Sequence, residues 1–349
     1  MVKKILQAVG FGLFCAILIL YVAPLFNRTS LFSSEKEIMS YHDAVKVASP
    51  AVVNVYNQAF DTSFTQDSQG SNGLHVTNLG SGVIMSKDGY ILTNKHVIQN
   101  ADEILVALQN GTFSSATLVG SDTLTDLAVL KIEADNLPTI PQNPKRPVRV
   151  GDVVLAIGNP FNLGQSITQG IISATGRSAL TEGGRQNFIQ TDASINRGNS
   201  GGALVNSLGE LIGISTLSLG KNSDEIAEGL NFAIPISLAN RVLEKIIQDG
   251  RVIRGYLGVG SDLFYTAKQL GIADYGVIVT NVTPSAPAEQ AGIQVGDLIL
   301  EVAGVKAETP QQMMETLAEL KPQTQVKVLV SRNGRLLEFM VTIGEYPES

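Results

Sequence analysis

The sequence predicts a mainly β protein of antiparallel barrels or sandwiches, preceded by one apolar helix. Short runs rich in β-branched residues recur between turn residues, and the clearest cover residues 51–55, 81–85, 104–108 and 153–157. The chain of 349 residues is 44% hydrophobic and contains 34 glycines, which suits β-rich globular structure. This length allows two or three domains.

The first element is the apolar segment from Ile5 to Asn27, which contains no charged residue. About 20 apolar residues suffice to cross a bilayer as a helix. Because no Ala-x-Ala cleavage pattern follows, we favour a retained transmembrane anchor over residues 1–28 rather than a cleaved signal peptide. Lys3 and Lys4 precede the segment and favour the cytoplasmic side. In a bacterium, this orientation places the rest of the chain in the periplasm, outside the inner membrane.

The remaining composition narrows the possible functions. The net charge of −7 argues against a nucleic-acid-binding protein, because such proteins usually carry a basic face. Cys15 is the only cysteine and lies in the apolar segment, so the outer part has no disulfide, cysteine nucleophile or cysteine-rich metal site. Residues 29–45 are interpreted as a tether, and residues 41–48 as a short amphipathic stretch that leads into the next domain. Residues 61–78 are predicted to form a mobile loop.

A glycine-rich turn carries the strongest chemical signal, Gly198-Asn199-Ser200-Gly201-Gly202. Glycines allow tight positive-φ geometry and let backbone N–H groups point inward. A nucleophilic serine needs a neighbouring base and donors for the developing oxyanion. We therefore predict Ser200 as the nucleophile, with the N–H groups of Gly198 and Ser200 as the oxyanion hole. An ordinary β-turn is the alternative.

The base is predicted to be His96, one of three histidines. His42 lies in a polar stretch and His75 in the predicted loop, whereas His96 lies between an apolar strand-like run, residues 89–93, and the apolar pair at residues 97–98. The orienting carboxylate is predicted to be Asp126, because it opens the apolar run at residues 127–130. Asp122 is the competitor, but its turn-like surroundings predict a solvated side chain. The chain order of histidine, aspartate and serine is that of chymotrypsin-type double barrels.

Three motifs together resemble the signatures of the HtrA serine proteases: Thr93-Asn94-Lys95-His96-Val97, Asp126-Leu127-Ala128-Val129 and Gly198-Asn199-Ser200-Gly201-Gly202. The resemblance implies a chymotrypsin-like double six-stranded β-barrel protease domain over residues 46–250 and a serine endopeptidase that needs no metal or other cofactor. Asn199 replaces the aspartate of digestive enzymes, which pairs with a new N-terminus. An amide cannot form that ion pair, so this turn is expected to be free to switch between inactive and active arrangements.

The last hundred residues resemble one PDZ domain, residues 251–349. Tyr256-Leu257-Gly258-Val259 is similar to the carboxylate-binding loop, and residues 287–299 are similar to the central signature of that domain. Such a loop turns its N–H groups toward a peptide C-terminus while the peptide adds a strand to the sheet. On the predicted helix 310–320, either Met313, Met314 and Leu317 all line the side-chain pocket, or two of the three are core residues.

An anchor followed by a single PDZ domain is the layout of the stress-sensing branch of the HtrA family. By resemblance, the PDZ domain senses C-terminal peptides of misfolded outer-membrane proteins, and the protease then cuts an RseA-like anti-sigma factor. The same resemblance implies a homotrimer, with Tyr56, Phe60 and Phe64 as candidate contacts. Arg177 is expected to relay peptide binding to the active site, with a solvated surface arginine as the alternative. A broad degradative protease or chaperone and a non-catalytic peptide receptor are the rival functions.

Overall fold

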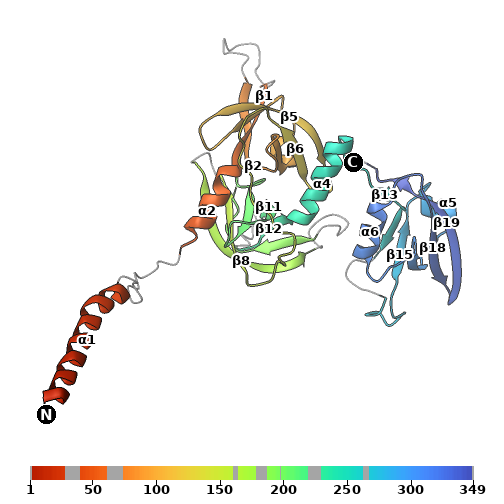
Figure 1. Cartoon of the computed structure of the whole chain (residues 1–349). Helices are drawn as coiled ribbons and strands as arrows, with labels where there is room; N and C mark the ends of the chain where they lie inside the picture. The colour runs from red at the N-terminus through yellow and green to blue at the C-terminus, as the bar shows by residue number, and fades with distance from the viewer. Residues whose placement is uncertain are drawn as a thin grey trace, which may run out of the picture. The chain divides into compact units, whose positions relative to one another are not determined.

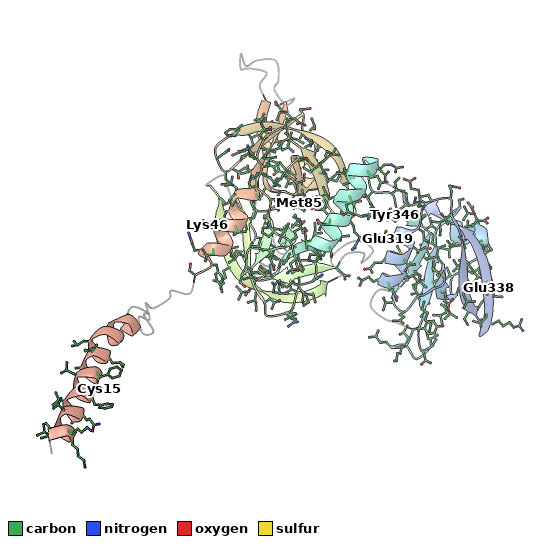
Figure 2. The ribbon with its side chains drawn as sticks, viewed as in Figure 1. Cys15, Lys46, Met85, Glu319, Glu338 and Tyr346 are labelled. Atoms are coloured by element: carbon green, nitrogen blue, oxygen red, sulfur yellow. The ribbon has the colours of Figure 1, made fainter. Side chains whose placement is uncertain are left out.

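The computed structural model describes residues 2–27, 40–60, 74–159, 164–177, 187–196, 198–218, 229–261 and 267–347. The chain divides into two compact units, Met1–Ser40 and Tyr41–Ser349. The first unit holds helix α1 (Val2–Asn27), on which Cys15 lies (Figure 2). Among the residues that the structure describes, no helix combines the length and the hydropathy of a membrane span.

The second unit begins with a short helix and a closed antiparallel barrel (Figure 1). Helix α2 (His42–Ala48) and the 3₁₀ turn η1 (Ser49–Ala51) confirm the predicted lead-in and bury Ala44, Ala48 and Ala51. The barrel has the strand order β1-β2-β3-β6-β5-β4. Its strands are β1 (Val52–Phe60), β2 (Leu74–Ile84), β3 (Tyr90–Asn94), β4 (Glu103–Ala107), β5 (Phe113–Asp122) and β6 (Leu127–Lys131). Helix α3 (Lys95–Ile98) follows β3 directly.

The hairpin of β1 and β2 corrects two expectations. Strand β2 already begins at Leu74, so the expected loop over residues 61–78 is wrong for residues 74–78. His75 pairs with Ala59 on β1 and thus belongs to this strand, although loop-forming residues precede it. The reason is that backbone pairing continues past a register shift at Asn57, which the polar composition did not reveal. Residues 61–73 lie outside the described part.

A second closed barrel follows, with the strand order β10-β11-β12-β9-β8-β7. Its strands are β7 (Val153–Gly158), β8 (Ser166–Arg177), β9 (Phe188–Thr191), β10 (Ala203–Asn206), β11 (Leu211–Ser218) and β12 (Asn231–Pro235). A single hydrophobic core includes Leu155 and Ile157 of this barrel together with Val53 and Leu92 of the first. The predicted double six-stranded barrel is therefore confirmed.

Helix α4 (Ile236–Asp249) joins the two barrels, because it contacts β5 and β6 of the first and β11 and β12 of the second. Its buried residues Ala239, Val242 and Ile246 recur at helical spacing, which makes one apolar face. Gly250 ends the helix at φ +74° and donates its N–H to the carbonyl of Ile246 at 2.9 Å, as left-handed glycine caps do.

The C-terminal part is a separate sheet with its own core and two helices (Figure 1). The main sheet has the order β14-β15-β16-β18-β19, with β17 paired to β16, while β13 pairs with β20. The strands are β13 (Gly255–Tyr256), β14 (Val259–Ser261), β15 (Val277–Val282), β16 (Leu298–Val302), β17 (Val305–Lys306), β18 (Gln325–Arg332), β19 (Arg335–Thr342) and β20 (Gly344–Glu345). The helices are α5 (Pro287–Ala291) and α6 (Pro310–Glu319).

Candidate active site

The structure places His96 and Asp126 in direct contact. The backbone N–H of His96 donates to Asp126 Oδ1 at 3.0 Å, and Nδ1 of the ring lies 2.6 Å from Asp126 Oδ2. An ionised carboxylate accepts only, so Nδ1 carries the proton in this contact and Nε2 is left as the acceptor. The carboxylate thus fixes both the orientation and the tautomer of the imidazole.

The backbone of Asp126 is held in an uncommon conformation. Its φ is +54°, a left-handed value that few residues other than glycine adopt. The Asp126 carbonyl accepts hydrogen bonds from the N–H of Lys95 and from Nδ2 of Asn94, both at 3.0 Å. These two bonds tie the residue to the start of α3, so the surrounding structure supports a strain of the kind found at functional sites.

The turn from Gly198 to Gly202, called the serine turn below, has the expected geometry. Gly198 and Gly201 have φ values of +97° and +83°. The N–H of Asn199 donates to the carbonyl of Asn196, and the N–H of Gly202 donates to that of Asn199, both at 2.9 Å. Among the described residues, the N–H groups of Gly198 and Ser200 have no acceptor. Two backbone donors beside the serine hydroxyl are therefore available to an anionic oxygen.

Thr216 on β11 links Ser200 to Asp126. Ser200 Oγ donates to the carbonyl of Thr216 at 3.0 Å, while Thr216 Oγ1 donates to Asp126 Oδ2 at 3.1 Å. One residue therefore connects the serine with the histidine–aspartate pair. The sequence predicts the strand of residues 214–217 as part of the specificity pocket but gives no signal that Thr216 joins the serine to the aspartate.

Asp122 corrects the expectation of a solvated side chain. It ends β5, is only 6% exposed and forms a bidentate pair with Arg254 at 2.6 and 2.7 Å. Burial raises the pKa of the Asp122 carboxyl, but Arg254 and the hydrogen bonds of Thr125 outweigh that effect and hold the pKa below its ordinary value. The prediction for Asp122 was wrong because its partner Arg254, which follows α4, is far away in the sequence.

Of the remaining residues of this region, the structure describes some in full and others only in part or not at all. Asn199 is 1% exposed, and within the described residues its Oδ1 has no hydrogen-bond partner. A Cβ on Gly158 would lie 2.7 Å from that oxygen. Arg177 ends β8 opposite Phe188, but its side chain and all of Arg197 lie outside the described part. The relay expected of Arg177 stays a prediction.

The loop Tyr256-Leu257-Gly258-Val259, called the carboxylate loop below, also presents free donors. Its Leu257 and Gly258 carbonyls accept from the N–H groups of Ala288 and Thr283, each at 2.8 Å. Among the described residues, the N–H groups of Leu257 and Gly258 have no acceptor. Strand β14, which begins at Val259, lies at the end of the sheet order, so an added strand can pair with it.

Helix α6 resolves the alternatives for its apolar residues. Met313 and Leu317 are each 1% exposed and belong to the hydrophobic core of the C-terminal sheet, whereas Met314 is only partly buried. The prediction of a pocket lined by all three is therefore wrong for Met313 and Leu317, because the inner face of the helix packs on the sheet. Glu319 at the end of α6 pairs with Lys245 of α4 at 3.4 Å (Figure 2).

Comparisons with known proteins agree with this architecture. The trypsin-like peptidase domain family matches residues 80–214, and the PDZ domain family matches residues 255–343. Together, the two barrels, the serine turn and the C-terminal sheet define a trypsin-like serine endopeptidase that carries a PDZ domain.

The relatives define the family more closely. Serine endoprotease DegS of Haemophilus influenzae is 58% identical over 99% of both chains. The probable periplasmic serine endoprotease DegP-like of Halomonas elongata is 42% identical and covers 78% of this chain and 57% of its own length. The solved structure of the HtrA-type protease AlgW with decapeptide is 42% identical, with a TM-score of 0.78 and coverage of 89% of this chain and 100% of that chain. The chain belongs to the HtrA family of serine proteases.

Proposed function

We propose that Ser200, His96 and Asp126 form the catalytic triad of this endopeptidase. The observation that carries the proposal is the hydrogen-bond chain from Ser200 through Thr216 to Asp126 and His96. For attack, the Ser200 hydroxyl rotates from the Thr216 carbonyl toward Nε2 of His96, which takes the proton and later returns it to the leaving amine. Asp126 stabilises the imidazolium, and no metal or organic cofactor takes part.

The free N–H groups of Gly198 and Ser200 form the proposed oxyanion hole. They stabilise the negative charge that develops on the carbonyl oxygen of the substrate during attack. We place the catalytic domain at residues 46–250 and the PDZ domain at residues 251–349. The two closed barrels and the separate core of the C-terminal sheet support these limits.

We further propose a DegS-like regulatory role. The PDZ domain binds C-terminal peptides of misfolded outer-membrane proteins, and the activated protease cuts an RseA-like anti-sigma factor, which starts the envelope stress response. Full-length similarity to DegS supports this proposal, as do the two free donors of the carboxylate loop. A relative, AlgW, is known in complex with a decapeptide, which agrees with peptide control.

The proposed location is the periplasmic face of the bacterial inner membrane. The uncharged sequence from Ile5 to Asn27 supports an anchor over residues 1–28, and the DegP-like relative is named periplasmic. We propose a homotrimer that uses the face around Tyr56, whose ring lies 6.1 Å from that of Phe113, a side chain 63% exposed. Phe60 and Phe64 belong to the same proposal, although the structure does not describe their side chains.

The decisive experiment follows cleavage by the full chain in detergent micelles. The substrates are the periplasmic domain of an RseA-like anti-sigma factor and a permanently unfolded protein, each with and without a peptide that ends in hydrophobic residues. We expect the free-acid peptide to accelerate anti-sigma cleavage about 5- to 150-fold, the usual range of allosteric coupling. The same peptide with an amidated C-terminus is the matched control, and Ser200→Ala should remove all cleavage.

Two results would reject parts of the proposal. Equal acceleration by the amidated peptide would reject carboxylate sensing, and rapid digestion of the unfolded protein without any peptide would favour a broad degradative protease. Retention of the full chain in membranes after alkaline extraction, against release of a variant without residues 1–28, tests the anchor. A sedimentation mass other than three chains would reject the trimer.

A further inference from the structure

Ser81 of the first barrel forms hydrogen bonds to the serine turn of the second barrel. Its side chain is completely buried. The Ser81 hydroxyl donates to the carbonyl of Gly198 at 2.6 Å and accepts from the N–H of Asn159 at 2.9 Å. Its backbone N–H donates to the carbonyl of Ser200 at 2.8 Å. One residue of strand β2 therefore binds the carbonyls on both sides of Asn199.

The surrounding residues show why this approach is possible. A Cβ on Gly82 would lie 2.7 Å from Ile91, and a Cβ on Gly201 would lie 2.1 Å from the carbonyl oxygen of Ser81. Glycine at position 201 lets the serine turn approach β2, and glycine at position 82 lets β2 pack closely against Ile91 of β3. The Thr93 hydroxyl on β3 donates to the same Ser81 carbonyl at 2.7 Å. A hydrogen bond from β3 therefore also holds Ser81 in position.

The hydrogen bonds of the turn alternate along the backbone. The peptide group between Gly198 and Asn199 is anchored at its carbonyl by Ser81 and at its N–H by Asn196. The peptide group between Ser200 and Gly201 is anchored at its carbonyl by Ser81 and at its N–H by Ser215. These two groups flank the peptide group that carries the Ser200 N–H, so the direction of this N–H is fixed as well. The Gly198 N–H lies directly before the first anchored group.

We propose that Ser81 is a positioning residue of the oxyanion hole. Its hydroxyl holds the Gly198 carbonyl away from the substrate, so that the N–H groups of Gly198 and Ser200 face the developing oxyanion together. Any arrangement of the turn that reverses the peptide group after Gly198 loses the 2.6 Å bond and leaves the buried Ser81 hydroxyl without its acceptor. The proposal rests on the catalytic role proposed for Ser200.

The test measures the full chain in detergent with Ser81→Ala and a fluorogenic peptide that the unmodified protein cleaves. Loss of one oxyanion donor costs about 100- to 1,000-fold in kcat, and misaligned donors cost less, so we expect kcat to fall about 10- to 100-fold with little change in KM. A peptide boronic acid forms a tetrahedral adduct with an oxygen in the hole. Its inhibition constant should rise by the factor by which kcat/KM falls, because it resembles the transition state.

The matched control is Ser49→Ala, which removes a buried hydroxyl oxygen on η1, outside the serine turn, that has no hydrogen-bond partner among the described residues. It should leave kcat within about threefold, because no hydrogen bond is lost. If Ser81→Ala does not fold, Ser81→Cys keeps the side-chain size with a weaker donor, and its kcat should still fall while its boronate inhibition constant rises.

Each result has a clear meaning. Folded Ser81→Ala with unchanged kcat and unchanged boronate affinity overturns the proposal, and so does an equal loss in Ser81→Ala and Ser49→Ala. A lower thermal unfolding midpoint with full activity per titrated active site also overturns it, because Ser81 would then only stabilise the fold. Cleavage by Ser200→Ala at the unmodified rate would reject the nucleophile itself, a failure separate from that of Ser81.

Discussion

The serine turn and the carboxylate loop share one backbone arrangement, but different contacts hold it in place. Each contains a glycine at φ +83°, Gly201 in the turn and Gly258 in the loop. In each, protein donors occupy backbone carbonyls while two N–H groups stay free for an anionic oxygen. The residues that bind these carbonyls differ. Ser81 binds the turn from the other barrel and lies 117 residues from Gly198 in the sequence. Thr283 and Ala288 bind the loop from within its own domain.

This difference shows that the serine turn and the carboxylate loop depend on different packing contacts. The geometry of the serine turn depends on how the two barrels pack, because Ser81 and the turn belong to different barrels. The contacts that hold the carboxylate loop lie within the PDZ domain. We therefore expect a change in one set of contacts to act first on the function proposed for that segment, while the proposed coupling links the two functions.

The largest effect is expected for Gly201→Ala. A Cβ there would lie 2.1 Å from the Ser81 carbonyl oxygen, so the turn must shift in addition to bearing a positive φ. We expect kcat/KM to fall about 1,000-fold or more, because both oxyanion donors move. Gly111→Ala is the control, since Gly111 has a φ of +84° and nothing within 4 Å of its Cβ position. Similar activity in the two variants would contradict the predicted dependence on the Ser81 contact.

A smaller and separate effect is expected for Gly258→Ala. Its Cβ would lie 2.2 Å from Cβ of Ala286, which displaces the carboxylate loop. We expect the affinity for a labelled peptide with a free C-terminus, measured by fluorescence anisotropy, to fall about 10- to 100-fold, as for the loss of a charge-assisted hydrogen bond. Gly334→Ala, with φ +78° and open space around the new Cβ, should bind normally. Equal binding by both variants would show that the loop is not the carboxylate site.

The buried pair of Asp122 and Arg254 ties the catalytic domain to the start of the PDZ domain and gives a stability prediction. Arg254→Met leaves the buried carboxylate with its Thr125 hydrogen bonds but without its charged partner, which should cost about 3 to 5 kcal/mol and lower the thermal unfolding midpoint. Arg146→Met is the control, because Arg146 is 48% exposed in its pair with Glu210 and such surface pairs contribute about 0 to 1 kcal/mol. Equal midpoints in the two variants would contradict this ranking.

The pH dependence of the same variant has a definite sign. Because the folded pKa of Asp122 lies below its ordinary 3.8, its contribution to stability is present above about pH 4 and is lost as the pH falls through the folded pKa. Without Arg254, the burial that raises this pKa is less opposed, so the folded pKa moves up toward or past its ordinary value. The loss of stability on acidification should therefore be smaller in the variant than in the unmodified protein, or reversed. Midpoints recorded between neutral pH and about pH 3 test this, and parallel curves for both proteins would contradict it.

Local patterns were enough for much of the architecture. The β-rich runs, the amphipathic helix before Gly250 and the glycine turn around Ser200 depend on neighbours within a few residues, so the sequence predicts them directly. Met313 and Leu317 show where such patterns stop, because helical spacing marks an inner face but does not say whether it meets a ligand or a sheet. The prediction that His75 lies in a loop was wrong for the same reason, since its pairing partner Ala59 lies beyond a polar segment of the sequence.

The sequence by itself determined the residue types of the candidate site and their order along the chain. Only the tertiary structure decided that Thr216 joins Ser200 to Asp126, that Arg254 buries Asp122, and that Ser81 holds the serine turn. These contacts connect segments that the chain separates by tens of residues or more. Their geometry is set by how the two barrels and the following segment pack, which no short stretch of sequence encodes.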